Sequence, residues 1–199
     1  MPFNRLPIST LAIETGYCRP YFNTPNLVTA SASALEVMTD LRYVPAAIIQ
    51  ENVDLDTATQ KMIARGVRAL LVTNDADDVV GIITARDLLG SRLEQILNTG
   101  RQICDIRVRE IMTAHEQIEV LPLNNVLHAH VGDIVETLKH SGRQHALVVE
   151  EDLLTSKASI RGIFSASQIA RQLGIPLQGQ ELTQTFEQID LAIKAHHTL

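Results

Sequence analysis

Short apolar runs alternate with a longer periodic stretch in the first half of the chain. Residues 46–50 (AAIIQ) and 69–73 (ALLVT) are short and mostly apolar, which is typical of buried strands. Residues 56–65 (DTATQKMIAR) between them predict a helix, with Asp56 as its N-cap and Gly66 as the residue that ends it. This stretch therefore predicts a strand, a helix and a second strand.

A hairpin and a second helix are expected next. Residues 74–78 (NDADD) predict a polar turn, and residues 79–83 (VVGII) predict a strand that pairs with the preceding one. A helix is expected from Thr84 to Asn98-Thr99-Gly100, because the apolar residues recur at helical spacing. These residues are Leu88, Leu89, Leu93, Ile96 and Leu97. The order of elements is β-α-β-β-α.

The second half of the chain repeats this order. Its predicted strands are residues 117–121 (QIEVL), 146–150 (ALVVE) and 159–164 (SIRGIF). A helix over residues 129–140 precedes Gly142, and another runs from Ser165 to Gly174. The second copy is longer by two residues before its middle strand and by five in its hairpin turn, where loops tolerate insertions. We therefore predict a mixed α/β (α+β) fold of two repeats, packed by pseudo-twofold symmetry through their sheets.

Composition narrows the class of protein. The 199 residues are 45% hydrophobic and 20% charged, as in an ordinary globular protein of one large or two small domains. A net charge of −6 argues against a broad nucleic-acid surface. No apolar segment resembles a signal peptide or reaches the ~20 residues of a membrane span, so a cytoplasmic protein is expected. For Cys18 and Cys104 we expect free thiols, with a disulfide as the open alternative.

Three short sequences in each copy carry a family resemblance. The first copy has Val37-Met38-Thr39, Gly66-Val67-Arg68-Ala69-Leu70-Leu71-Val72 and Gly81-Ile82-Ile83-Thr84-Ala85-Arg86-Asp87-Leu88. The second has Ile111-Met112-Thr113, Gly142-Arg143-Gln144-His145-Ala146-Leu147-Val148 and Gly162-Ile163-Phe164-Ser165-Ala166-Ser167-Gln168-Ile169. Each set resembles a CBS domain, and together they resemble a tandem pair, or Bateman module. The resemblance implies nucleotide clefts between the copies, adenosyl ligands and frequent pairing into a disc-like dimer.

These boundaries divide the chain into four parts. We expect an N-terminal arm over residues 1–33, one repeat over 34–100 and a second over 101–175. Residues 176–199 are expected to form a helical tail, with an amphipathic helix over 180–197 that packs on the repeats or on a second copy.

Thr84 and Asp87 allow two interpretations. Thr-x-x-Asp is a capping box, in which each side chain bonds the backbone N–H of the other residue. The same carboxylate accepts hydrogen bonds from both hydroxyls of a ribose, while Arg86 and the helix N-terminus favour a phosphate. In the second copy Ser165 and Gln168 are expected to form the same box. Because Gln168 is neutral, we expect a weaker or empty site there.

The resemblance implies further ligand-binding positions. In the first copy Ala47 matches a position against the adenine, Val67 an apolar neighbour of the base, and Arg68 a residue near phosphate or a solvated surface arginine. In the second copy the residues matched to the last two are Gln144 and His145, and His145 either contacts the ligand or is merely exposed.

The sequence contains no convincing catalytic or metal-binding set. Gly-x-Ser-x-Gly and P-loop patterns are absent, and His128 and His130 have no nearby acids or cysteines to complete a metal site. We therefore expect no catalytic residues, no metal and no required cofactor. The predicted function is that of a regulatory module that binds AMP, ADP, ATP or another adenosyl compound, forms a homodimer and signals to an unknown partner protein. The alternatives are a structural dimerisation module with empty clefts and a nucleotide-processing enzyme.

Overall fold

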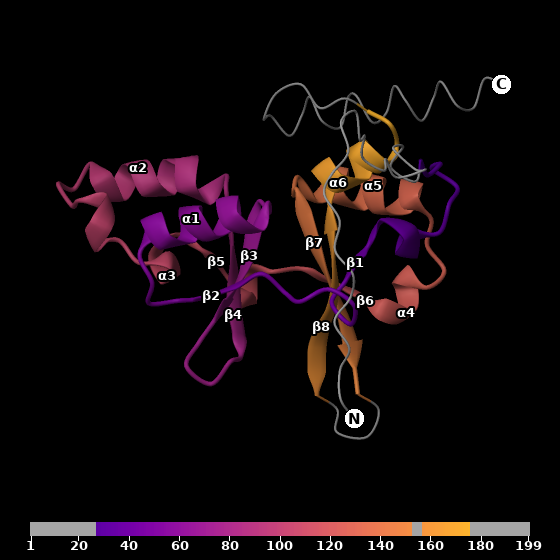
Figure 1. The fold of residues 1–199 in the computed structure, drawn as a ribbon, viewed down its shortest axis with the longest axis horizontal. Coiled ribbons are helices and arrows are strands. Elements are labelled where there is room, and N and C mark those ends of the chain that lie inside the picture. Colours follow the sequence, from indigo (N-terminus) through magenta and orange to yellow (C-terminus); the bar gives the residue numbers. More distant parts are fainter. Residues whose placement is uncertain (1–26, 153–156, 176–199) are drawn as a thin grey trace, which may run out of the picture.

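Two lobes, each built on a four-stranded sheet, lie side by side in the computed structural model, which describes residues 27–152 and 157–175 (Figure 1). One sheet has the strand order β2 (Ile48–Gln50), β3 (Ala69–Thr73), β4 (Val79–Thr84), β5 (Thr113–Ala114). The other has the order β1 (Thr39–Asp40), β8 (Ala158–Ser165), β7 (His145–Glu151), β6 (Val120–Pro122). The predicted mixed fold of two repeats packed through their sheets is confirmed.

The first lobe follows the predicted order of elements. Helix α1 (Leu55–Arg65) ends at Gly66, whose φ of 62° lies in the left-handed region that favours glycine. Its N-cap is Asp54 and not Asp56 as predicted, because the Asp54 side chain accepts a hydrogen bond from Thr57 N at 2.8 Å. Strand β2 pairs in parallel with β3, and β3 forms the predicted antiparallel hairpin with β4.

The predicted helix after Thr84 is interrupted. Residues Asp87–Leu89 form a 3-10 turn, η2, and the α-helix α2 covers only Ser91–Leu97. Gly90 between them has an extended backbone and lies against the preceding turn, because an added Cβ would stand 3.0 Å from the Arg86 carbonyl oxygen. The apolar periodicity therefore included the buried Leu93 but did not predict the break in the helix or the exposure of Leu89 and Leu97.

The second lobe repeats this plan with one more helix. Helix α5 (Val131–Ser141) ends at Gly142 with a φ of 65°, and α6 (Ala166–Gln172) follows β8. The strand predicted over residues 117–121 begins later, as β6, after the 3-10 turn η4 (His115–Gln117). The short helix α4 (Leu123–Val126) was not predicted.

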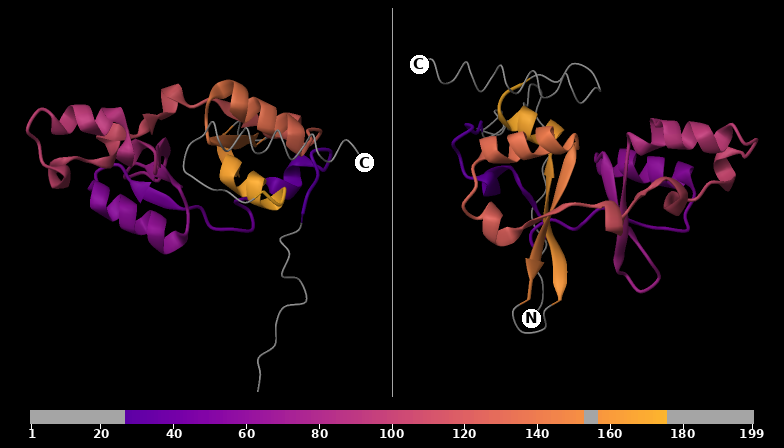
Figure 2. Two further views of the ribbon diagram at one scale, coloured as in Figure 1. Left: turned by 90° about the horizontal axis from the view of Figure 1, so that it is seen from above. Right: turned by 180° about the vertical axis from the view of Figure 1, so that it is seen from behind.

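The first segment of each repeat packs on the other lobe. The 3-10 helix η1 (Ala34–Val37) and strand β1 begin the first repeat, but β1 pairs with β8 of the second. The second repeat begins with the 3-10 turn η3 (Ile103–Asp105), helix α3 (Val108–Ile111) and strand β5, and β5 pairs with β4 of the first. The chain therefore crosses between the lobes twice, as the view from behind shows (Figure 2). The domain boundaries predicted at residues 34 and 101 divide the sequence, whereas the lobes exchange these segments in space.

Three apolar clusters follow from this exchange. The core of the second lobe contains Phe164 together with Ala34 and Val37 from the exchanged segment. The core of the first lobe likewise contains Val108 and Ile111 from the exchanged segment of the second repeat. Between the sheets lies a smaller cluster with Leu71, Ile82 and Leu147 at its centre. Each exchanged segment buries apolar side chains in the core of the other lobe, and this burial holds the two lobes together.

The strand registers relate the two lobes position by position. Ala69 lies opposite Thr84 in the first hairpin, and His145 lies opposite Ser165 in the second. Both hairpins are irregular at the same place, after Val72 and after Val148. The pseudo-twofold relation predicted from the sequence thus extends to the β-irregularities.

Candidate functional site

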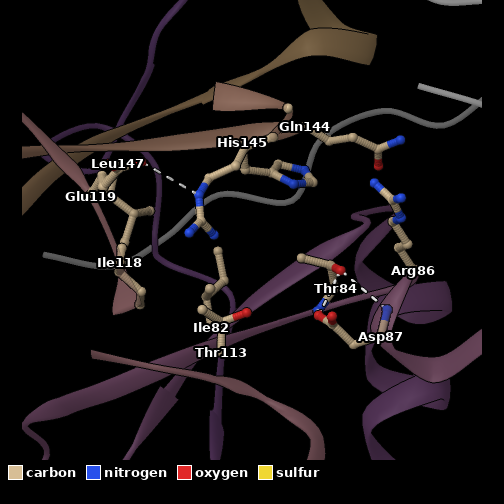
Figure 3. A pocket seen from close by; sticks show the side chains of 12 residues that line it. Ile82, Thr84, Arg86, Asp87, Thr113, Ile118, Glu119, Gln144, His145 and Leu147 are labelled. Atoms are coloured by element: carbon tan, nitrogen blue, oxygen red, sulfur yellow. Dashed lines mark hydrogen bonds and ion pairs between the residues drawn. The ribbon is translucent and has the colours of Figure 1, made fainter. Parts of the chain in front are cut away.

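A cavity of about 240 Å³ opens between the two lobes, where the end of β4 faces the start of β7 (Figure 3). We call it the inter-repeat cleft. The first lobe contributes Ile82, Thr84, Arg86, Asp87 and Thr113. The second lobe contributes Ile118, Glu119, Gly142, Arg143, Gln144, His145 and Leu147. The cleft is therefore composite, and neither repeat forms it alone.

The predicted capping box is present at the edge of this cleft. Asp87 Oδ2 accepts hydrogen bonds from Thr84 N and from Thr84 Oγ1, both at 2.7 Å, and Thr84 Oγ1 lies 3.3 Å from Asp87 N. Both side chains are half-buried. Within residues 27–152 and 157–175 no hydrogen bond to Asp87 Oδ1 is found. One carboxylate oxygen thus holds the turn, while the other remains available to a donor in the cleft.

Arg86 and Gln144 face one another across the cleft from opposite lobes (Figure 3). Arg86 is exposed, and Gln144 is half-buried at the start of β7. A guanidinium offers planar, charge-assisted hydrogen bonds to phosphate oxygens, so Arg86 suits an anionic group at this end of the cleft.

His145 places a neutral imidazole in the cleft. Burial, and secondarily the positive charge of Arg68, lower its pKa to about 4. At neutral pH the ring therefore carries no charge and offers one donor and one acceptor nitrogen. The prediction of a merely exposed histidine does not hold, because the side chain is half-buried and lines the cavity.

Glu119 and Arg143 form a loose ion pair on the second lobe. Arg143 Nε lies 3.8 Å from Glu119 Oε2, and Arg143 Nη2 donates a hydrogen bond of 2.9 Å to the Gln117 carbonyl oxygen. Together with His145, both residues also line a neighbouring cavity beside α5, whose floor includes Leu121 and Ala146. Their side chains therefore form part of the wall between two cavities.

The residues matched to base and phosphate positions in the first copy do not line the inter-repeat cleft. Ala47 packs partly buried against the core of the first lobe. Val67 lines a separate apolar groove beside α1 and η2. Arg68 is exposed and influences the cleft through its charge near His145. The sequence assigned these residues to one site with Asp87, and that assignment stays a prediction.

The register also corrects the correspondence between the copies. Because Ala69 and His145 occupy equivalent strand positions, Arg68 corresponds to Gln144 and Val67 to Arg143. Likewise, Ile48 and Val120 pair with equivalent residues of β3 and β7, so the position of Ala47 corresponds to Glu119. The sequence comparison had matched Val67 and Arg68 to Gln144 and His145, which is one residue too far toward the C-terminus.

The corresponding box in the second lobe does not form. Ser165 is the N-cap residue of α6, but its hydroxyl lies 3.0 Å from Ser167 Oγ and makes no capping hydrogen bond. Gln168 Oε1 instead accepts a hydrogen bond of 3.1 Å from Thr39 Oγ1, on the exchanged strand β1. Neither Ser165 nor Gln168 lines the inter-repeat cleft.

Sequence reasoning missed Thr113, Glu119 and Arg143. Thr113 was quoted only as part of the family resemblance, and its place beside Asp87 follows from the pairing of β5 with β4. Arg143 directly follows Gly142, as Val67 follows Gly66, and a count from the two glycines would have found it. Glu119 carried no comparable signal, because the first strand of the second copy was predicted too early.

Comparisons with known proteins agree with this architecture. A model of the CBS domain family matches residues 24–94. The crystal structure of a CBS domain is 26% identical, with a TM-score of 0.51, and covers 70% of this chain and 96% of that chain. An uncharacterized conserved protein from Pyrococcus horikoshii is 22% identical, with a TM-score of 0.54, and covers 77% of this chain and 100% of its own. A CBS-domain containing protein from Agrobacterium tumefaciens is 18% identical, with a TM-score of 0.52, covering 77% and 98%.

One curated relative also matches. Inosine-5'-monophosphate dehydrogenase from Thermoplasma acidophilum is 27% identical over 107 residues, which is 54% of this chain but only 21% of that enzyme. The chain thus spans about a fifth of the length of this relative. Residues 24–94 thus match the CBS domain family, and the two lobes share the fold of the solved CBS-domain structures.

The described residues also bear on metal binding and on membrane insertion. Within residues 27–152 and 157–175, no group of three or more His, Cys, Asp and Glu side chains is placed to hold a metal ion. In the same residues no helix has the length and hydropathy needed to cross a membrane. Cys104 is an exposed free thiol, whereas Cys18 lies outside the described residues, as do the predicted tail helix and most of the N-terminal arm.

Proposed function

We propose that this protein is a regulatory module that binds a nucleoside phosphate in the inter-repeat cleft. The observation that carries the proposal is that Asp87, whose Oδ1 accepts no hydrogen bond from the described residues, lines a cavity also lined by Arg86. A ribose hydroxyl would donate to that oxygen, and the guanidinium would bind phosphate. The family resemblance favours adenosyl compounds, and the identity of the base is a separate question from the binding of the ribose.

The regulatory mechanism follows from the composite nature of the cleft. A ligand that contacts Asp87 on one lobe and His145 on the other would stabilise the arrangement of lobes in which both contacts form. Differential affinity for two arrangements is sufficient to shift their populations, and a partner protein would respond to the shift.

A thermal-shift screen tests this proposal. The purified protein would be heated with AMP, ADP, ATP, S-adenosylmethionine, NAD and the corresponding guanine nucleotides. Binding to the native state stabilises it by about 2.7 kcal/mol at a hundredfold excess over Kd. A rise in Tm with any of these ligands supports the proposal, whereas no shift with all of them favours a structural module with an empty cleft.

We propose a non-catalytic role for the cleft. In the cleft the Thr84 hydroxyl donates to Asp87 within the capping box. A side chain held in this way serves the fold and has no free base to activate it. Incubation with the best ligand followed by chromatography should return it unchanged, and appearance of a product would instead support an enzyme.

We also propose a homodimer through the groove beside α1 and η2. This groove is lined by Thr59, Met62, Ile63, Gly66, Val67, Ala85, Leu88 and Leu89. Ile63 is 69% exposed and Leu89 is 74% exposed, so two large apolar side chains face the solvent next to it. Sedimentation should give a dimer at micromolar concentration that Leu89→Glu dissociates, and a monomeric parent protein would contradict this part of the proposal.

A further inference from the structure

The inter-repeat cleft has a carboxylate at each end. Asp87 lies at one end with Thr84 and Arg86, and Glu119 lies at the other on the second lobe (Figure 3). Apolar side chains also line the cleft: Ile82, Ile118 and Leu147. A ligand that spans the cleft therefore meets an acceptor group at both ends, and a ribose accounts for only one of them.

Glu119 is available to a ligand. Its side chain is 81% exposed and its ion pair with Arg143 is long, at 3.8 Å between Nε and Oε2. The pair is therefore weak in the solvent that surrounds it. Arg143 is held at its other end by the Gln117 carbonyl oxygen, which keeps the guanidinium beside the carboxylate. A carboxylate and a guanidinium thus stand next to one another with hydrogen-bonding capacity to spare.

The equivalent positions of the first lobe are apolar. The strand registers place Ala47 where Glu119 stands, and Val67 where Arg143 stands. Neither Ala47 nor Val67 can form a hydrogen bond through its side chain to the edge of a base. The two lobes therefore share a fold but differ in chemistry at these two positions. The fold alone does not require the charged pair Glu119–Arg143.

A nucleobase edge must match this pair of charges. An ionised carboxylate only accepts hydrogen bonds, and a guanidinium only donates them. Guanine presents two adjacent donors, N1–H and N2–H, and beside them two acceptors, O6 and N7, which arginine binds in a bidentate manner. Adenine presents an acceptor at N1 and a donor at N6, which would meet the carboxylate and the guanidinium with the wrong polarity.

We infer that Glu119 and Arg143 select a guanine base over adenine in the inter-repeat cleft. The inference rests on the proposed nucleotide function and specifies its ligand class. Glu119 accepts from N1–H and N2–H, Arg143 donates to O6 and N7, and the ring lies on Leu147 and Ile118. The ribose then reaches Asp87, and the phosphate groups reach Arg86.

Calorimetric titration with GDP, IDP and ADP tests this inference directly, because the three ligands differ only in the base. Hypoxanthine keeps N1–H and O6 but lacks the 2-amino group, so IDP should bind between the other two. We expect GDP to bind at least about tenfold more tightly than ADP, the factor that one charge-assisted hydrogen bond supplies.

Two variants assign the preference to these residues. Glu119→Gln replaces one acceptor oxygen by a donor amide and should reduce GDP affinity about tenfold or more without weakening ADP. The double variant Glu119→Ala/Arg143→Val reproduces the apolar pair of the first lobe and should abolish the preference for GDP. Glu116→Gln is the matched control, because Glu116 is exposed and does not line the cleft. Its affinities should equal those of the parent.

The outcomes separate this inference from the proposed function. ADP binding as tightly as GDP overturns the base assignment and leaves the nucleotide site standing. A preference for GDP that survives in Glu119→Gln shows that another group reads the base and also overturns the assignment. If none of the three nucleotides binds, the proposed function fails and this inference fails with it.

Discussion

The ends of β4 and β8 have the same place in their lobes but different chemistry. At the end of β4, Asp87 caps the turn with one carboxylate oxygen and leaves the other in the inter-repeat cleft. After β8, the amide of Gln168 is bonded to Thr39 of the exchanged strand. The comparison shows that equivalent positions carry an acid that lines the cleft in one copy and an amide that contacts the exchanged strand in the other.

The exchanged strands differ in a similar way. Asp40 of β1 forms an ion pair with Arg161 of β8, and Arg161 Nε also lies 3.3 Å from Glu150 Oε2. This pairing lowers the pKa of Asp40, chiefly through the hydrogen bond from Arg161. The corresponding residue of β5 is Ala114, which has no charge to pair. An ion pair therefore joins the exchanged strand to the second lobe, whereas the equivalent residue in the first lobe is uncharged.

The largest expected difference between the lobes lies in their cores. Phe164 and Ile83 are equivalent by register and both are 0% exposed. Phe164→Ala should lower the free energy of unfolding by about 3–5 kcal/mol, and Ile83→Ala by less, because the aromatic ring leaves the larger cavity. Urea denaturation of both variants checks this. A greater loss for Ile83→Ala would show that the first lobe, not the second, limits stability.

A second difference between the lobes is the space beside the glycine that each exchanged segment packs against. A Cβ at Gly81 would stand 2.7 Å from the Thr113 carbonyl oxygen, whereas a Cβ at Gly162 would meet only atoms of the Met38 side chain. A methionine side chain can move aside, but the backbone of β5 cannot. Gly81→Ala should therefore cost about 1–3 kcal/mol and Gly162→Ala less than about 1 kcal/mol. Equal melting temperatures for the two variants would refute this account of the crossings.

A third difference between the lobes is the pH dependence of stability, because His145 stands where the first lobe has Ala69. The pKa of His145 is lowered to about 4 by burial and by Arg68. Between about pH 6.5 and pH 4 the unfolded chain binds this proton and the folded chain does not, so stability falls as pH falls through that range. Acidification from pH 7 to pH 5 should cost on the order of 1–2 kcal/mol after allowance for solvent screening. In His145→Ala this loss should disappear, as urea denaturation at the two pH values would show; an unchanged loss would assign it to other groups.

The smallest expected effect concerns Gln168→Asp. The change introduces the acid that the second lobe lacks, but it shortens the side chain and weakens the hydrogen bond to Thr39. We expect at most a second, weak binding event in a calorimetric titration, with Kd at least about tenfold above that of the first. A second event as strong as the first would mean that the acid alone defines a site.

Local signals predicted the elements well. The apolar runs at β3 and β4 and the glycines that end α1 and α5 determine structure within a few residues, so their pattern was sufficient. The N-cap was misplaced because Asp54 and Asp56 flank Leu55, and the burial of Leu55 at 1% exposure selects Asp54. Tertiary contact decided between two equally good capping residues.

The sequence predicted the candidate site only in part. Thr84, Arg86 and Asp87 were identified together because they are adjacent in sequence, and the capping box follows from their spacing. Their partners across the cleft come from the other repeat, and the strand exchange that brings Thr113 to them is a pairing of distant residues. Ala47 and Val67 were assigned to the same site as Asp87, but they do not line the inter-repeat cleft.

The central claim is that Asp87 binds a ligand in addition to capping a turn, and Asp87→Asn tests it most directly. The amide keeps one acceptor oxygen for Thr84, so the stability cost should be about 1 kcal/mol or less. It removes the charge that a ribose diol binds, so nucleotide affinity should fall by roughly ten- to a hundredfold. Titration calorimetry and melting temperatures of the parent and the variant measure both effects. Loss of affinity with an intact fold is the predicted result, and a variant that binds like the parent would reduce Asp87 to a cap.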